Sequence, residues 1–287
     1  MGELPNQIVQ GVLVGGLYAM YAMGLSLSVG VMRFVNIAHG DLIVLISFLI
    51  LTLIHATGMG ALPATLIALP IAFAGGYLLQ RFLLQRVLGK GVLPIILVTF
   101  GLSIIIQNGL LGVFGADTRR VSGGGIETAT LKIGGGINVG VLPLVIFLGA
   151  IAMVMALDWL LYRTRLGARI RAVSDDPATA NLVGLPSARV YATAMGIVGV
   201  TIAISAGFMS IWTNFDPTAG PSRLLIAFEA VVLGGLGSLW GTLVGGIIIG
   251  VAQALGAQID VGWQLLAGHI AFLVIFLARP EGLFPKY

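Results

Sequence analysis

The 287-residue sequence has no cysteine and few charged residues. Without cysteine the chain can form no disulfide, no thiolate metal site and no thiol chemistry. Only 9% of its residues are charged, whereas a typical soluble domain has about 25%. Hydrophobic residues make up 58%, and the mean hydropathy is +1.06. Such a chain cannot cover a globular surface with ionic side chains, so we expect it to lie in a membrane.

Motifs for catalysis and for ATP hydrolysis are also missing. Gly89-Lys90 lacks both the upstream glycine and the following Ser or Thr of a Walker A motif. The sequence contains neither His-Glu-x-x-His nor Gly-x-Ser-x-Gly. The net charge is +4, but no basic run alternates with aromatic residues, which argues against nucleic acid as a partner. We therefore expect no enzyme activity, no catalytic residue, no metal site and no cofactor in this chain.

Apolar segments separated by short polar breaks fill most of the sequence. There are nine, at residues 8–32, 37–54, 61–79, 92–114, 139–162, 190–212, 224–236, 241–255 and 261–277. A helix needs about 20 apolar residues to cross a bilayer, so segment 224–236 is too short and predicts a re-entrant or broken helix. We predict one all-α, polytopic helical bundle over residues 1–287, with eight to ten crossings.

Lysine and arginine are distributed unevenly between alternate loops. With the N-terminus outside, four of the fifteen lie on the outer side, at Arg119, Arg120, Lys132 and Arg223, and the other eleven lie inside. Because positive residues accumulate on the cytoplasmic side, this places the N-terminus outside and the C-terminus inside. Loop 163–188 is then cytoplasmic. Loop 115–138 is external, and its glycine triplets predict a hairpin or a flexible cover.

Glycine is abundant, with 42 residues, and much of it lies inside the apolar segments. Pairs such as Gly11 and Gly15, or Gly246 and Gly250, have the small-xxx-small spacing that lets helix backbones approach closely in lipid. The spacing predicts tight helix packing. A gating interface between moving helices is the alternative.

Polar residues gather where the second apolar segment begins, at Asn36, His39 and Asp41. Polar groups at membrane depth are costly and usually face a cavity or the bundle interior. Asp41 could cap a half-helix that starts at Leu42, with Gly40 permitting the break. Discontinuous helices of this kind build substrate sites in transporters, so we predict that the cluster borders a translocation path. The alternative is a polar turn at the membrane interface.

Glu229 is the single acid deep inside an apolar segment. An intramembrane carboxylate is a candidate functional group because exposure to lipid would be costly. We expect Glu229 to face the bundle interior. A neutral or paired structural acid is the other interpretation.

The loop at 163–188 contains the signals of a short, separately capped helix. Asp176 suits an N-cap, Pro177 the first helical position and Gly184 the C-terminal cap. The seven residues between the caps span about 10 Å of helix. Its small, weakly polar residues, which suit close approach to a partner, are Ala178, Thr179, Ala180 and Asn181.

Taken together, these stretches resemble the LivH-type permeases of branched-chain amino acid ABC importers. The resemblance covers nearly the whole chain and is strongest at residues 35–41, 101–108, 163–184, 230–238 and 279–284. It implies a bacterial inner-membrane subunit that works with a second LivH- or LivM-like permease, as a heterodimer in preference to a homodimer. It also implies two ATPase subunits, which use ATP and Mg, and a periplasmic solute-binding protein.

Under this resemblance the chain forms the translocation path for branched-chain or related amino acids, and loop 163–184 docks on an ATPase. The alternative class is an ion-coupled secondary transporter, for which inverted repeats with paired intramembrane acids are typical. The expected path residues are Asn36, His39, Gly40, Asp41, Gln107, Asn108 and Glu229. The expected coupling residues are Gly167, Arg171, Asp176, Pro177, Ala178, Ala180 and Gly184.

Overall fold

The computed structural model describes residues 3–134 and 137–284, and helices make up most of them. The first four are α1 (Glu3–Met32), α2 (His39–Thr57), α3 (Ala61–Leu78) and α4 (Val92–Phe114). The middle of the chain forms α5 (Val141–Arg163), α6 (Arg165–Asp175), α7 (Pro177–Leu182) and α8 (Ser187–Trp212). The last part forms α9 (Gly220–Gly234), α10 (Leu239–Ile259) and α11 (Trp263–Ala278). The predicted all-α bundle is confirmed.

Each of the nine apolar segments forms a helix, but they differ in length. Within the described ranges, seven helices are long and apolar enough to cross a membrane: α1, α2, α3 with its extension to Arg86, α4, α5, α8 and α10. The extension of α3 consists of a π-helical turn (η1, Leu79–Leu83) and a 3₁₀ turn (η2, Leu84–Arg86). Helices α9 and α11 have only 15 and 16 residues. The shortness predicted for segment 224–236 is therefore real.

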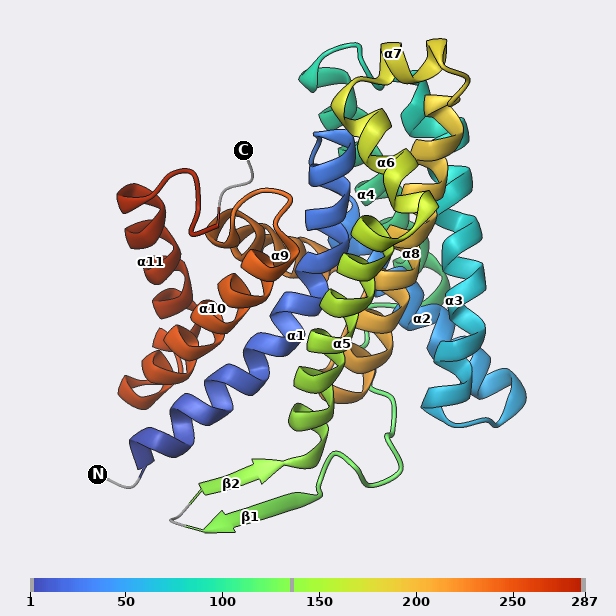
Figure 1. The fold of residues 1–287 in the computed structure, drawn as a ribbon. Coiled ribbons are helices and arrows are strands. Elements are labelled where there is room, and N and C mark those ends of the chain that lie inside the picture. The colour runs from blue at the N-terminus through green and yellow to red at the C-terminus, as the bar shows by residue number, and fades with distance from the viewer. Residues whose placement is uncertain (1–2, 135–136, 285–287) are drawn as a thin grey trace.

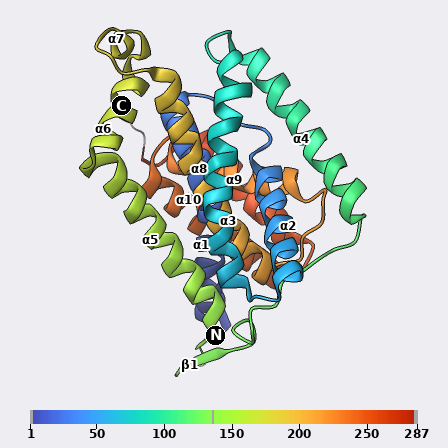
Figure 2. The same ribbon diagram turned by 90° about the vertical axis from the view of Figure 1, so that its right-hand side faces the viewer.

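The polar segments lie at two opposite ends of the bundle (Figures 1 and 2). One end, which we call the hairpin end, contains the start of α1 and the hairpin of β1 (Thr130–Gly134) and β2 (Ile137–Gly140). Asn138 joins them, because its N–H donates to the side-chain oxygen of Asn6 at 3.1 Å. The opposite end, the α7 end, carries α6 and α7. Loop 115–138 thus contains a hairpin, although Gly135 and Gly136 lie outside the described residues.

Helix α1 runs through the centre and packs most extensively on α10. Glycine makes this contact possible, since a Cβ on Gly15 would lie 2.5 Å from the Cα of Ile247. A Cβ on Gly11 would lie 2.6 Å from the Cα of Val251. These are backbone contacts that no larger residue permits. The tight packing predicted from the glycine spacing is therefore confirmed for α1 and α10.

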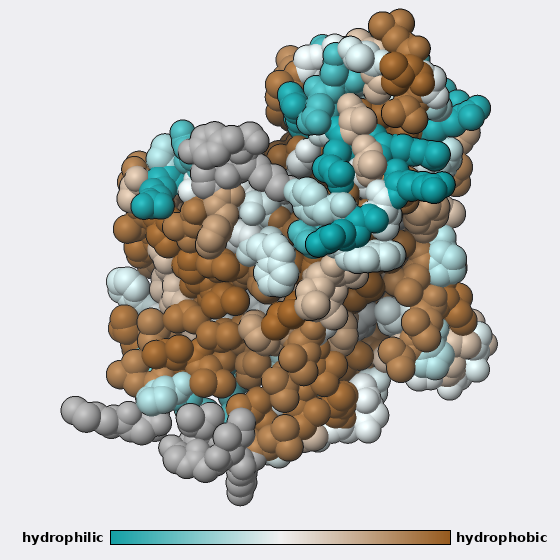
Figure 3. All heavy atoms as spheres, viewed as in Figure 1, coloured by the Kyte–Doolittle hydropathy of each residue, from teal (hydrophilic) through white to brown (hydrophobic). Residues whose placement is uncertain are grey.

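The sides of the bundle are apolar, and polar side chains collect over α6 at the α7 end (Figure 3). Helix α4 shows this clearly, because Val92, Leu97 and Ile105 are each more than half exposed. Exposed apolar side chains in such a belt are what lipid tails require. Their distribution supports a multi-pass membrane protein.

Candidate functional site

The second helix begins deep inside the bundle rather than at its surface. The Nε2 atom of His39, the first residue of α2, lies 2.8 Å from the carbonyl oxygen of Tyr21. Tyr21 precedes Met32, the end of α1, by eleven residues, which is roughly 16 Å of helix. The connection between α1 and α2 therefore leads from the end of α1 back into the bundle. Within it the side-chain oxygen of Asn36 accepts a hydrogen bond from the N–H of Ala38 at 3.1 Å. Asn36, His39 and Asp41 are consequently all buried, each with at most 1% exposure.

Asp41 does not cap a helix. The prediction of a half-helix from Leu42 is wrong, because α2 starts at His39 and Asp41 lies in its first turn. Its Oδ1 atom instead accepts a hydrogen bond from Nε2 of Gln107 in α4, at 3.0 Å. An acid in the first turn still interacts favourably with the positive end of the helix dipole.

Gly40 does not break the helix either. A Cβ at this position would lie 2.7 Å from the backbone nitrogen of Leu224 and would also overlap the carbonyl of Gly220. The glycine is therefore needed because α9 packs directly on the first turn of α2. Position 220 also requires glycine, because a Cβ there would overlap the Asp41 side chain. Helices α2 and α9 thus meet at their first turns, and α9 is the short helix of the segment for which the sequence predicts a re-entrant or broken helix.

Helix α4 contributes a polar face to this cluster. Thr99, Ser103 and Gln107 follow each other at four-residue spacing, and Gln107 also donates to Oγ of Ser103 at 3.1 Å. Thr99 and Ser103 are buried; both were missed in the sequence, although their four-residue spacing from Gln107 is the signal that could have found them. Asn108 is different, because it is exposed and donates to the carbonyl of Ile104 at 2.8 Å. Of the two α4 residues expected in the path, the structure brings only Gln107 to Asp41.

Glu229 belongs to a separate polar contact between α9 and α11. It is 3% exposed, as expected for a side chain facing the interior, and its Oε1 lies 2.6 Å from Nδ1 of His269. Nearby in the same half of the bundle, the hydroxyl of Tyr18 donates to Oε1 of Gln253 at 2.5 Å. His269 was missed in the sequence, because it lies 40 residues from Glu229 and follows no spacing rule.

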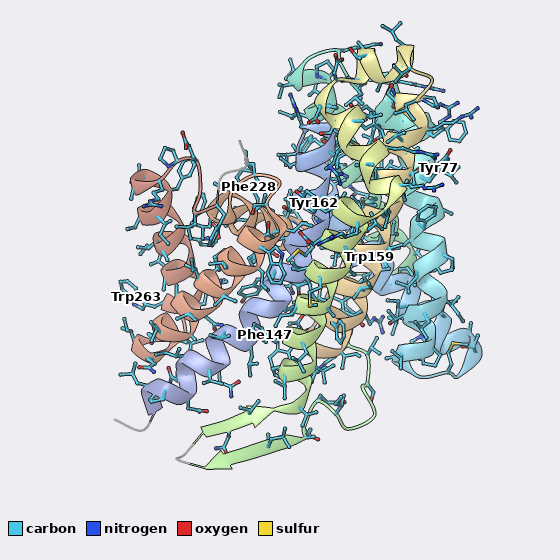
Figure 4. The ribbon with its side chains drawn as sticks, in the orientation of Figure 1. Tyr77, Phe147, Trp159, Tyr162, Phe228 and Trp263 are labelled. Atoms are coloured by element: carbon cyan, nitrogen blue, oxygen red, sulfur yellow. The ribbon has the colours of Figure 1, made fainter. Side chains whose placement is uncertain are left out.

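A large apolar cavity opens near the α7 end, with a volume of about 1160 Å³. The end of α1, the start of α4 and the C-terminal halves of α9 and α11 form its walls. Phe228, which Figure 4 labels on α9, and Phe276 on α11 are among its lining side chains. Val35 and Ile37 also line it, and they belong to the connection that leads to the Asn36 cluster. A buried polar cluster and an apolar cavity are therefore neighbours along one stretch of chain.

The segment between α5 and α8 forms two helices, where the sequence predicts one. Helix α6 was missed because its arginines were interpreted as topology signals. Thr164 caps it by accepting from the N–H of Gly167 at 3.0 Å. A Cβ on Gly167 would overlap the carbonyls of Leu160 and Leu161, so this glycine lets α6 fold back on α5.

The caps of α7 agree closely with the prediction. Oδ1 of Asp176 accepts from the N–H groups of Ala178 and Thr179, at 2.9 and 3.1 Å. Hydrogen bonds from Thr179 lower the pKa of the Asp176 carboxyl. The bond from the Thr179 hydroxyl has the largest effect, and the bond from its backbone N–H comes next. At the other end Gly184 has φ +83° and Leu185 donates to the carbonyl of Ala180 at 2.9 Å. Gly184 is thus the left-handed residue directly after the C-cap, a position that favours glycine.

The exposed face of α7 differs in part from the one expected. Ala180 is only 5% exposed and packs inward, whereas Leu182 and Val183 are 87% and 71% exposed. Ala178, Thr179 and Asn181 are exposed as expected, but Leu182 at the end of α7 and Val183 after it add two large apolar side chains to this surface. The position of α7 at the end of the bundle is plain in Figures 1 and 2.

Comparison with known proteins places this architecture in a family. Residues 7–278 match the family described as the branched-chain amino acid transport system permease component. The chain belongs to this family. It is 28% identical over 294 residues to the high-affinity branched-chain amino acid permease BraD of Pseudomonas aeruginosa, covering 97% of this chain and 94% of the relative.

Two further relatives are permeases named LivH. The Escherichia coli K12 protein is 27% identical over 293 residues, which cover 97% of this chain and 94% of the relative. The probable LivH of Methanocaldococcus jannaschii is 25% identical over 297 residues, covering 97% and 90%. These alignments cover nearly the full length of this LivH-type permease.

Proposed function

We propose that this LivH-type permease forms part of the translocation path of an ABC importer for branched-chain or related amino acids. A periplasmic binding protein delivers the solute, and separate ATPase subunits supply the energy from ATP and Mg. A second LivH- or LivM-like permease completes the membrane domain as a heterodimer. The chain lies in the bacterial inner membrane with the hairpin end periplasmic and the α7 end cytoplasmic. The distribution of lysine and arginine supports this orientation.

One observation carries this proposal, namely the exposed apolar tip of α7. A capped helix outside the bundle is not needed to connect α5 to α8, and exposed Leu182 and Val183 at a polar end have no lipid to contact. Exposed apolar side chains with a polar surround are typical of a protein interaction site. Docking of α7 on an ATPase subunit explains both the separate capped helix and its exposed apolar side chains.

The interior supports a path for an amphipathic solute. The cluster of Asp41 and Gln107 offers hydrogen-bonding groups, and the adjoining cavity offers an apolar surface. An amino acid with a branched aliphatic side chain needs both kinds of contact. Selectivity among such solutes rests largely with the binding protein.

The coupling proposal is tested by Leu182→Glu in the complex reconstituted in liposomes. Val261→Glu is the matched control, because Val261 is 81% exposed and lies in the α10–α11 connection, away from α7. We expect Leu182→Glu to weaken ATPase association and to uncouple ATP hydrolysis from uptake, while the control behaves as the parent. Full assembly and full uptake with Leu182→Glu would contradict the proposal. Ala180→Glu is a poorer choice, since Ala180 is buried and its change would disturb α7 itself.

The path is tested by single cysteines at Asn36, His39 and Asp41, since the chain has no cysteine of its own. We expect small water-soluble thiol reagents to modify at least one of them in some nucleotide state. Inertness of all three in every state would assign the cluster a purely structural role.

The same liposomes separate an ABC importer from an ion-coupled transporter. We expect uptake only with the ATPase subunits and ATP present. Uptake driven by a proton or sodium gradient in their absence would favour the ion-coupled class.

A further inference from the structure

A second cavity, of about 810 Å³, lies beside the apolar one and has a more polar lining. Its walls are the last turns of α1, the end of α5, the C-terminal half of α6 and the α9–α10 connection. Three charged side chains line it: Arg33, Arg171 and Asp175. The ion pairs found in residues 3–134 and 137–284 involve none of these three. The cavity therefore carries an excess of one positive charge that the protein does not neutralise.

Arg171 has a free donor in this cavity. Its guanidinium lies over the ring of Tyr162, 5.0 Å from the ring centroid. Its Nη1 atom is buried and has no hydrogen-bond partner within the described part of the chain. A buried unpaired donor is costly, so a group of this kind in a native structure indicates a missing partner.

A hydrogen bond between α6 and α1 and the backbone conformation of Arg33 shape the walls of the cavity. Ser174 of α6 donates to the carbonyl of Gly30 in α1 at 3.1 Å, which holds the two helices together. Arg33 has φ +57°, a left-handed conformation that is unfavourable for a residue with a Cβ. Strain of this kind persists where the surrounding structure determines the conformation, often at a binding site. Here it turns the chain out of α1 and leaves the Arg33 side chain lining the cavity.

Aromatic residues mark the height of this cavity in the membrane. Trp159 and Tyr162 of α5 are 62% and 42% exposed, and Figure 4 labels both on the part of that helix nearest α6. Trp240, next to Leu239 in the cavity wall, is 47% exposed. Tryptophan and tyrosine concentrate at the level of lipid headgroups. In Figure 3 the surface changes from polar to apolar below this level.

The apolar surface continues along α5 toward the hairpin end. Leu148 and Met155 are 56% and 57% exposed there. A molecule with a charged head in the cavity and long apolar chains would cover both surfaces at once.

We propose that this cavity binds an anionic phospholipid. The phosphodiester accepts hydrogen bonds from Arg33 and Arg171, and the acyl chains lie along the exposed face of α5. The planar guanidinium of arginine suits phosphate oxygens, and basic pockets between transmembrane helices are known to hold lipid headgroups. The excess positive charge favours phosphatidylglycerol over zwitterionic phosphatidylethanolamine. The proposal does not depend on the solute or on the ATPase, although a lipid here would steady α6, which carries α7.

The test is native mass spectrometry of the complete, delipidated transporter complex. Dioleoyl phosphatidylglycerol, dioleoyl phosphatidylethanolamine and inorganic phosphate are offered in separate samples. We expect phosphatidylglycerol to be retained preferentially, and retention to fall about tenfold with Arg33→Gln or Arg171→Gln, the loss expected for one charge-assisted hydrogen bond. Arg165→Gln is the control, because Arg165 lies on the same helix but does not line the cavity.

Four results would overturn the proposal. Equal retention of the two lipids, or equal retention by all variants, would mean that the cavity does not select a headgroup. Displacement of the lipid by millimolar inorganic phosphate would identify a free anion as the ligand. Loss of ATPase subunits without loss of lipid would identify the cavity as a contact with a protein partner.

A second measurement needs no variant and so does not depend on folding of the substituted chains. Photoactivatable phosphatidylglycerol with its reactive group near the headgroup is crosslinked to the native complex. We expect labelled peptides from the end of α5 and from α6. Labelling confined to other parts of the surface would also overturn the assignment.

Discussion

The contact between α1 and α10 and the contact between α2 and α4 hold this bundle together in different ways. At the first, glycines bring two backbones together, so that a Cβ on Gly15 would lie 2.5 Å from the Cα of Ile247. At the second, a side-chain hydrogen bond from Gln107 to Asp41 and a ring contact between Phe48 and Phe114, 4.6 Å between centroids, join α4 to α2. Backbone contacts of the first kind leave no room for sliding, whereas contacts between side chains can break and reform. We infer that α1 and α10 form a fixed frame and that α4 is the more movable element.

The largest effect is expected from a change in the frame. Gly15→Leu places a side chain where the α10 backbone lies, and overpacking of this kind costs about 1–3 kcal/mol or more when backbones must move. We expect most of the folded protein to be lost, as measured by yield and by thermal unfolding in detergent. Gly109→Leu in α4 is the control, because nothing lies within 4 Å of a Cβ at Gly109. If both variants unfolded equally, the distinction between frame and movable helix would be wrong.

The next effect tests the attachment of α4. Gln107→Leu keeps the size of the side chain but removes the donor to Asp41, which costs about 1–3 kcal/mol for a buried acceptor left unpaired. We expect faster amide exchange in α4 and slower transport, with the α1–α10 contact unaffected. Asn108→Leu should change neither property, because Asn108 bonds only within its own helix. Unchanged exchange in α4 with Gln107→Leu would remove the argument for a polar attachment.

A smaller effect is expected at the contact between α9 and α11. Glu229→Gln retains a hydrogen-bonding oxygen toward His269, so we expect normal expression and a stability loss on the order of 1 kcal/mol. Transport or its pH dependence should change, because the pair loses its carboxylate. His55→Ala is the control, since His55 is exposed. Identical transport at every pH would leave this pair a structural role only.

The smallest effect concerns the cap of α7. Asp176→Ala should speed amide exchange at Ala178 and Thr179, the two N–H groups that the carboxylate accepts from. Asp176→Asn retains an accepting oxygen and should exchange nearly as slowly as the parent. Because the pKa of Asp176 is lowered in the folded chain, its contribution is present above the unfolded pKa and is lost as pH falls through the folded one. Exchange near neutral pH should therefore not vary with pH beyond its intrinsic dependence, and a variation there would contradict the capping role.

Local signals in the sequence were sufficient for a large part of this structure. Apolar run length identified the helices, and Asp176 and Gly184 marked the ends of α7, because caps depend on a few neighbouring residues. Helix α6 was missed, since its arginines fit a topology signal equally well. The burial of Ala180 and the exposure of Leu182 were not predicted, because exposure depends on how α7 packs on α6 and α8, which is not a local property.

The sequence by itself determined that this chain spans a membrane, which stretches form its helices and which permease family it belongs to. Only the tertiary structure decided which polar groups meet. Asp41 and Gln107 are 66 residues apart, and Glu229 and His269 are 40 apart. These pairs form because glycine contacts such as Gly40 with Gly220 fix how close the helices lie and at what height each begins. Spacing along one chain specifies the face of one helix, but the partner of that face depends on packing between distant segments.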